Sequence, residues 1–139
     1  MPTWIYHMTD VGNLRSILTA GQLVSLNGLR REQHDFTNIA YETLQDRRAT
    51  KQVSCGPGGV LHDYVPFYFG PRSPMLFVIK QGRVASYLGG QRSVVHLATT
   101  VEAIQQTGAR FVFTDGHAIM ELSRFYEDLS DLTKVDWYY

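Results

Sequence analysis

The stretch GPGGVLHDYVPFYFGPRSPMLFVI, residues 56–79, decides how the rest of the chain is interpreted. Its aromatic run Tyr64–Phe69 has high strand propensity and is bounded on both sides by Gly and Pro clusters that are typical of turns. A second apolar run, Met75–Ile79, follows after a Gly-Pro loop, and the two runs are predicted to form adjacent strands. Most of these rings are expected in the core. Three side chains beside the turns are instead suited to stack on, and pair with, a flat and charged ligand: Tyr64, Tyr68 and Arg72.

The composition indicates one globular domain without a membrane span. With 139 residues, of which 44% are hydrophobic, the chain is long enough for one core and too short for two. The mean hydropathy of −0.18 and the lack of a long apolar run argue against a transmembrane helix. The single cysteine, Cys55, cannot form an internal disulfide, and the opening MPTWIYHMTD lacks the features of an export signal. We therefore expect a cytoplasmic protein.

The charge distribution is more informative than the net charge. Thirteen basic and thirteen acidic residues cancel, so the total gives no argument for a nucleic-acid partner. The basic residues of the first half nevertheless gather in a few places: Arg30, Arg31, Arg47, Arg48 and Lys51.

The N-terminal segment predicts a strand, a tight turn and a helix. Thr3–Met8 alternates as a strand, Asp10 is placed as a helix N-cap, and apolar residues at helical spacing lead to a stop at Gly21. His7 and Thr9 lie at this turn, where a donor and an acceptor at a helix N-terminus suit a ribose or a pyrophosphate. A histidine in such a place can equally be a structural hydrogen-bonding residue.

The remaining elements are predicted from local signals and give an α+β fold with a bent, partly antiparallel central sheet and short flanking helices. In chain order they are a loop over Asn27–Asn38, a helix over Ile39–Lys51, a turn at Cys55–Gly59, a strand over Ser93–Leu97, a helix from Thr99 or Thr100 to Gly108, a strand over Arg110–Thr114, a turn at Asp115–His117 and a helix that carries Ile119, Leu122, Phe125 and Tyr126.

Several classes of site are excluded by their missing signatures. The five histidines show no HxH or HxxxH spacing, and one cysteine cannot build a structural zinc site, so we expect no metal. No GxGxxG follows a strand, and the Gly-rich turn at Cys55–Gly59 lacks the Gly-Lys-Ser/Thr ending of a P-loop.

The run VPFYFGPRSPML, residues 65–76, resembles the DarT family of DNA ADP-ribosyltransferase toxins. The preceding GPGG turn and the helix with Arg47-Arg48 are similar to the same family, as are the opening IYHMTDVGNL, the DGHA turn and the SRFY segment near the end. The resemblance covers essentially the whole chain. It implies a single ADP-ribosyltransferase-like domain over residues 1–139, which splits NAD and attaches ADP-ribose to thymine in single-stranded DNA. It also implies a monomer whose partner is an antitoxin with a macrodomain, DarG.

The same resemblance implies roles for individual residues. The catalytic arginine would be Arg47 or Arg48, with Arg47 favoured, and it would stabilise developing charge because a guanidinium stays protonated. The residues implied to bind NAD are His7, Met8, Thr9, Asn13, Leu23, Tyr41 and Arg47. The residues implied to line the DNA channel are Tyr68, Arg72, Met75 and His117.

One departure from the family bears on activity. The family's catalytic glutamate lies in a basic stretch beyond the region that matches Asp136-Trp137, and we therefore expect this chain to be C-terminally truncated. A truncated or degenerate form that binds NAD or single-stranded DNA without transfer is the main alternative. A small RNA-binding module is a third hypothesis, and it predicts solvent-exposed Phe67 and Phe69 on a sheet face.

Overall fold

The computed structural model describes most of the chain, and the α+β prediction is confirmed. The described residues are 2–31, 48–70, 93–116, 118 and 123–135. Several predicted features lie outside the described residues, namely the strand Met75–Ile79 and the site residues Tyr41, Arg47, Arg72, Met75 and His117.

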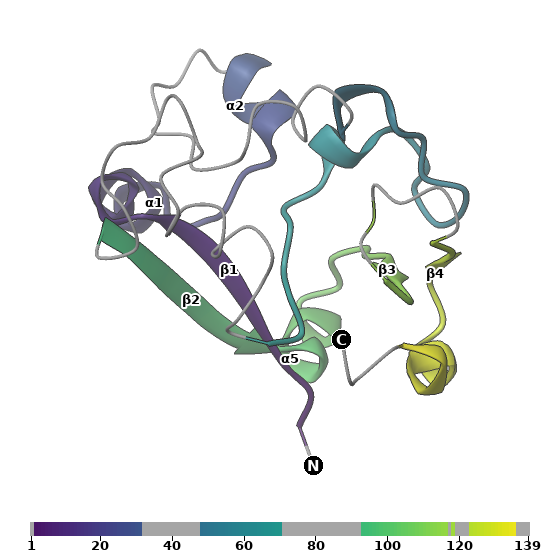
Figure 1. Ribbon diagram of the computed structural model, residues 1–139. Coiled ribbons are helices and arrows are strands. Elements are labelled where there is room, and N and C mark those ends of the chain that lie inside the picture. Colours follow the sequence, from purple (N-terminus) through teal and green to yellow (C-terminus); the bar gives the residue numbers. More distant parts are fainter. Residues whose placement is uncertain (1, 32–47, 71–92, 117, 119–122, 136–139) are drawn as a thin grey trace.

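Strand β1 (Trp4–Asp10) is flanked on both edges. Along one edge it pairs antiparallel with β2 (Val94–Thr100), in a register that runs from Trp4 opposite Thr100 to Asp10 opposite Val94 (Figure 1). Along the other edge Tyr6 and Tyr68 form an isolated antiparallel bridge, in which each backbone N–H donates to the other residue's carbonyl at 2.8 Å. β1 is therefore the strand through which the segment before residue 70 and the segment after residue 93 meet.

The predicted turn and helix after β1 are confirmed in outline. The Asp10 carboxylate accepts a hydrogen bond from Gly12 N at 2.7 Å and begins the 3₁₀ turn η1 (Val11–Asn13), which continues into α1 (Leu14–Ala20). Gly21 ends the helix with a φ of 70°, a left-handed conformation that glycine adopts at little cost. Leu18, however, is 76% exposed, so the apolar spacing in α1 does not face a core within the described residues.

The predicted loop Asn27–Asn38 is wrong over its first part, because α2 (Leu26–Arg31) is helical. The Ser25 hydroxyl accepts from Gly28 N at 3.1 Å at the start of this helix. The Asn27 side-chain amide donates to Asp63 Oδ1 at 2.9 Å, and α2 packs against the 3₁₀ turn η2 (Leu61–Asp63). A distant partner thus stabilises a helix that has no apolar periodicity of its own.

The Gly-rich turn is confirmed, whereas the aromatic strand is mostly wrong. Gly56, Gly58 and Gly59 have φ values of 59°, 71° and 74°, as a tight turn requires. Within the run predicted as a strand, only Tyr68 takes part in a bridge, and residues 65–67 have no regular secondary structure. The run is instead held by single contacts, including the hydrogen bond from the Tyr64 hydroxyl to Gly58 O at 2.6 Å.

The helix after β2 follows its prediction. α5 (Val101–Gln106) is capped by Thr100, whose hydroxyl accepts from Ala103 N at 3.0 Å, and the following turn reaches Gly108 with a φ of 78°. Val101 is buried, as are Ile5 and Met8 of β1.

The C-terminal part contains a second small sheet and departs from its prediction. β3 (Phe113–Thr114) pairs antiparallel with β4 (Phe125–Tyr126). The predicted helix is therefore wrong at Phe125 and Tyr126. The rings of Phe113 and Tyr126 stack at 5.7 Å, and Arg124 N donates to Asp115 Oδ1 at 2.9 Å, which favours the extended pairing. A 3₁₀ helix, η4 (Leu129–Lys134), follows.

The second core lies between this part and the Gly-rich turn. Val53 and Leu61 are buried at its centre, and four partly buried side chains pack on them: Tyr64, Val112, Ala118 and Phe125. Within the described ranges, no helix is long and apolar enough to cross a membrane.

Candidate functional site

Two groups of predicted site residues are attached to one short stretch of backbone, which we call the Pro66–Tyr68 segment. Pro66 and Phe67 contact His7, while Tyr68 pairs with Tyr6 and neighbours Arg48. The segment runs along the edge of β1 that does not pair with β2. It connects the two groups, because Pro66 and Phe67 contact His7 and Tyr68 neighbours Arg48.

The geometry around His7 fixes the roles of its two ring nitrogens. Nδ1 lies 2.7 Å from the carbonyl oxygen of Pro66, and because a carbonyl only accepts, Nδ1 is the atom that carries the proton. The Phe67 ring packs on the imidazole with centroids 5.6 Å apart and an interplanar angle of 50°. Burial lowers the pKa of His7, although the Pro66 hydrogen bond acts in the opposite direction. The imidazole is therefore neutral at pH 7, and Nε2 is a hydrogen-bond acceptor.

This result changes what the turn after β1 can bind. The sequence suggested either a ribose or a pyrophosphate beside His7. An acceptor nitrogen suits a ribose hydroxyl, which donates, and does not suit a phosphate oxygen, which can only accept.

The other predicted residues near His7 are arranged as a compact group. Asn13 Nδ2 donates to the Thr9 hydroxyl at 3.1 Å, and this bond ties η1 back to β1. Thr9 is 7% exposed and Met8 is 5% exposed, whereas His7, Asn13 and Leu23 are half-buried. His7 and Thr9 lie on one face of β1 and Met8 on the other, and His7 and Asn13 are more exposed than Thr9.

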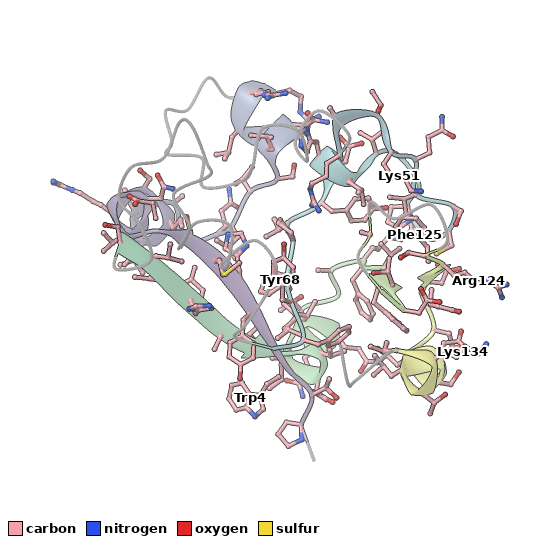
Figure 2. All side chains as sticks on the ribbon, in the orientation of Figure 1. Trp4, Lys51, Tyr68, Arg124, Phe125 and Lys134 are labelled. Carbon is pink, nitrogen blue, oxygen red and sulfur yellow. The ribbon has the colours of Figure 1, made fainter. Side chains whose placement is uncertain are left out.

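Arg48 and Tyr68 form the second group. Arg48 lies in a short helical stretch, residues 48–50, and Tyr68 lies beside the middle of β1 (Figure 2). Burial lowers the pKa of Arg48, while Tyr68 raises it; burial raises the pKa of Tyr68, while the charge of Arg48 lowers it. The two side chains are thus electrostatic neighbours in a largely desolvated place. An arginine remains cationic even there.

Four residues of the site were missed by the sequence analysis, namely His62, Asp63, Pro66 and Phe67. His62 is 3% exposed, and its pKa is lowered by burial and by the charges of Arg48 and Arg30, while Asp63 opposes this. Asp63 accepts hydrogen bonds from the Asn27 amide and from Val60 N at 3.0 Å. The available signal was position alone, since Leu61-His62-Asp63 comes directly between the Gly-rich turn and the aromatic run.

Asp63 also explains one glycine of the turn. A Cβ on Gly59 would lie 2.6 Å from Asp63 Oδ2, and the φ of 74° at this position is itself unfavourable for other residues. The Asp63 carboxylate therefore occupies the space that any larger residue at position 59 would need.

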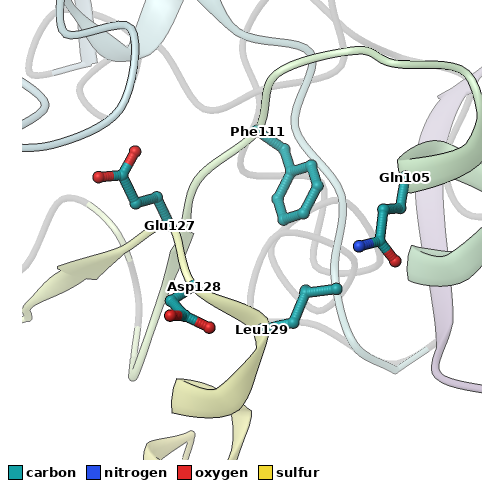
Figure 3. A pocket seen from close by; sticks show the side chains of 5 residues that line it. All are labelled: Gln105, Phe111, Glu127, Asp128 and Leu129. Carbon is teal, nitrogen blue, oxygen red and sulfur yellow. The ribbon is translucent and has the colours of Figure 1, made fainter.

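A separate shallow pocket lies at the junction of α5 and η4, and none of the predicted site residues lines it (Figure 3). Its lining consists of Gln105, Phe111, Glu127, Asp128 and Leu129. One Asp128 oxygen already accepts from Ser130 N at 2.9 Å at the start of η4. Across the parts of the chain that the structure describes, no group of three or more His, Cys, Asp or Glu side chains is placed to hold a metal ion.

Comparison with known proteins gives one consistent result. A family profile described as "ssDNA thymidine ADP-ribosyltransferase, DarT" matches residues 6–139. The chain is 46% identical to a DNA ADP-ribosyl transferase of Thermus sp. (strain 2.9) over 136 residues, which are 98% of the chain and 63% of that relative. It is 42% identical to the DNA ADP-ribosyl transferase of Thermus aquaticus over 99% of the chain and 60% of the relative. The chain thus spans about three-fifths of the length of these relatives.

Solved structures agree with the sequence comparison. Thermus sp. 2.9 DarT in complex with ADP-ribosylated ssDNA superimposes with a TM-score of 0.90 at 44% identity, over 98% of this chain and 63% of that chain. The same protein in complex with NAD+ gives a TM-score of 0.82 at 42% identity, with the same coverage. A Thermosipho africanus DarTG structure in complex with ADP-ribose, at 20% identity and a TM-score of 0.73 over 89% of this chain and 30% of that chain, is similar in fold.

Proposed function

Because the chain belongs to the DarT family of ssDNA thymidine ADP-ribosyltransferases, we propose that it binds NAD and takes part in transferring ADP-ribose to a thymine base of single-stranded DNA. The observation that carries the proposal is the Pro66–Tyr68 segment, which connects the His7 group to the Arg48–Tyr68 group. These are the two groups that the chemistry needs, one to orient a dinucleotide and one to stabilise charge. The solved relative has been observed with both NAD+ and ADP-ribosylated ssDNA, which supports this assignment.

In this proposal the His7 group holds the NAD molecule. The neutral His7 imidazole would accept a hydrogen bond from a sugar hydroxyl at Nε2, and Thr9 with Asn13 would define the adjacent wall. The full NAD-binding set is proposed to be His7, Met8, Thr9, Asn13, Leu23, Tyr41 and Arg47.

The arginine that stabilises the transition state is proposed to be Arg47 or Arg48, and Arg48 neighbours Tyr68. Cleavage of the nicotinamide–ribose bond leaves an oxocarbenium-like sugar, and the attacking thymine must lose its ring proton. A guanidinium stays protonated, so its contribution is to stabilise the developing negative charge on the base while the proton passes to solvent water. The burial of Arg48 beside Tyr68 supports this role, because a fixed cation in a desolvated place acts more strongly than one in water.

Tyr68, Arg72, Met75 and His117 are proposed to lie toward the DNA. An antitoxin with a macrodomain, of the DarG type, is proposed as the protein partner.

The test is the mass of a thymine-containing single-stranded oligonucleotide after incubation with the chain and NAD. We expect a gain of one ADP-ribose, and we expect Arg48→Ala to slow it by about 10²–10³-fold, the usual effect of removing one well-placed electrostatic group. Arg47→Ala is measured in parallel at saturating NAD, because Arg47 is also in the proposed NAD-binding set and its removal takes the same charge from the adjacent residue. A larger loss in Arg47→Ala than in Arg48→Ala would assign the role to Arg47.

A second candidate function is NAD binding without transfer. It is favoured by two contacts on the proposed NAD side, His7 with Pro66 and Asn13 with Thr9, both of which are made by residues of this chain. It predicts saturable NAD binding that is lost in His7→Ala, together with no change in the oligonucleotide mass. The RNA-binding alternative has less support, because Phe67 and Phe69 are half-buried and Phe67 packs on His7.

A further inference from the structure

Two arginines at the end of α2 are exposed and are not used by the proposed reaction. Arg30 and Arg31 form the last turn of this helix. Cations are favourable at a helix C-terminus, but α2 has only six residues and its dipole is correspondingly weak. The position of the two side chains relative to the rest of the site is more informative.

The packing of α2 on η2 places these arginines beside a turn that Arg48 also neighbours. The Asn27–Asp63 hydrogen bond of 2.9 Å fixes α2 on η2, and Arg31 lies along the helix, with Nη2 3.9 Å from the place of a Cβ on Gly28. Burial lowers the pKa of His62, and the positive charges of both Arg48 and Arg30 lower it further. The pKa of Asp63 is lowered by the Asn27 hydrogen bond, by the Val60 N–H and, to a smaller extent, by Arg31. Three arginine side chains therefore lie near η2, and together with His62 of η2 they form what we call the α2–η2 basic cluster, namely Arg30, Arg31, Arg48 and His62.

The cluster is positive in a chain whose net charge is zero. Asp63 is the carboxylate that acts on His62, and its two oxygens already accept hydrogen bonds from neutral donors, the Asn27 amide and the Val60 N–H. Arg30 and Arg31 are both exposed, so their guanidinium groups are accessible from solvent. A planar guanidinium matches the two terminal oxygens of a phosphate.

We propose that Arg30 and Arg31 bind backbone phosphates of the single-stranded DNA and guide the strand to Arg48 and Tyr68. This inference rests on the proposed function and adds a phosphate-binding surface to it. Grooves for single-stranded nucleic acid combine cations that follow the backbone with an aromatic ring on which a base stacks. Arg30 and Arg31 supply the first part, and Tyr68 lies beside Arg48 at the end of the cluster and supplies the second.

The experiment measures binding of a fluorescein-labelled, thymine-containing oligonucleotide by anisotropy at several NaCl concentrations, without NAD so that no transfer occurs. The slope of log K against log [NaCl] counts the phosphates contacted, at about 0.7 per phosphate on a single strand. We expect Arg30→Ala and Arg31→Ala each to reduce the slope by about 0.7 and to weaken binding by about tenfold at low salt. Arg30→Lys, which keeps the charge and loses the planar fork, is expected to keep the slope.

Arg124→Ala is the matched control, because Arg124 is also exposed and projects from the side of β4, away from α2 (Figures 1 and 2). It should leave both slope and affinity unchanged. NAD affinity, measured by calorimetry, should be unaltered in all four variants. Slopes in Arg30→Ala and Arg31→Ala equal to that of Arg124→Ala would overturn the inference and leave the proposed function standing. Weaker NAD binding with an unchanged DNA slope would also overturn it, and would assign the cluster to the pyrophosphate of NAD. A wild-type chain that binds no oligonucleotide would overturn both.

Discussion

The two edges of β1 are built in different ways. On one edge all seven residues of the strand are paired with β2 in a single antiparallel register. On the other edge the Pro66–Tyr68 segment makes one backbone bridge, at Tyr6–Tyr68, and its remaining contacts are to side chains of β1. The first edge repeats one interaction, whereas each interaction on the second edge is different.

This difference corresponds to a division of tasks. A regular ladder satisfies backbone groups and fixes register, but it leaves no backbone carbonyl available to orient a side chain. The irregular edge leaves Pro66 O free of the ladder, and that oxygen is the one that sets the tautomer of His7. Substitutions on the regular edge should have the largest effect, followed by those on the irregular edge and then by one at a contact of the residue that precedes β1.

The largest effect is expected from Leu97→Pro. Because Tyr6 directs its backbone groups to Tyr68, the alternation of an antiparallel ladder directs those of the next residue, His7, to Leu97. Proline removes the donor at that position and leaves a backbone carbonyl of β1 unsatisfied, which costs at least about 1–3 kcal/mol. Urea unfolding should show the loss. Leu97→Ala is the control, since it removes the side chain and keeps the N–H, and a proline variant as stable as the alanine variant would contradict the prediction.

A smaller effect, confined to binding, is expected at His7. His7→Asn keeps a donor near the place of Nδ1 and can still bond to Pro66 O, but it has no acceptor at the place of Nε2. We expect a nearly unchanged unfolding midpoint and NAD binding weakened by about tenfold, the value of one hydrogen bond. Because burial lowers the pKa of His7, wild-type binding should persist below the pH at which an exposed histidine protonates.

The complementary substitution is His7→Gln, which keeps an acceptor at the place of Nε2 and loses the donor at the place of Nδ1. Its Oε1 reaches the place of Nε2, so it should bind NAD more tightly than His7→Asn while losing stability at the Pro66 contact. If calorimetry gave the two variants equal NAD affinity, the acceptor role of Nε2 would be wrong.

The same contrast explains which elements were predictable from the sequence. The Asp10 cap, the stop at Gly21 and the Thr100 cap are decided within a few residues, and all three are confirmed. The helix α2 and the strand β4 were predicted incorrectly because distant partners decide them, Asp63 for the first and β3 for the second. Local propensity carries no information about such partners.

The site shows the same limit. His7, Thr9 and Asn13 lie within one local unit, and their proximity could be predicted from it. Arg48 and Tyr68 are twenty positions apart, with the turn at Gly56–Gly59 between them, so their electrostatic proximity could not be predicted from local sequence. Phe67 was assigned to the core on its residue type alone, which gives no indication that it packs on the His7 imidazole.

The smallest effect is expected from Glu102→Gln. Glu102 is in α5, and its carboxylate contacts Thr3, the residue just before β1. Both oxygens of the exposed Glu102 carboxylate accept from Thr3 N, at 3.2 and 3.0 Å, and this bond lowers the pKa of Glu102. A carboxyl group whose pKa is lower in the folded state stabilises the fold above its unfolded pKa, and this contribution is lost as the pH falls through the folded value. Urea unfolding should therefore show wild type slightly more stable than Glu102→Gln at pH 7, with the difference disappearing in the acid range. NAD affinity should be the same in both proteins at every pH. Glutamine keeps one acceptor and loses only the charge. A stability difference that stays constant from pH 7 to strongly acidic pH would therefore show that Glu102 acts through its shape.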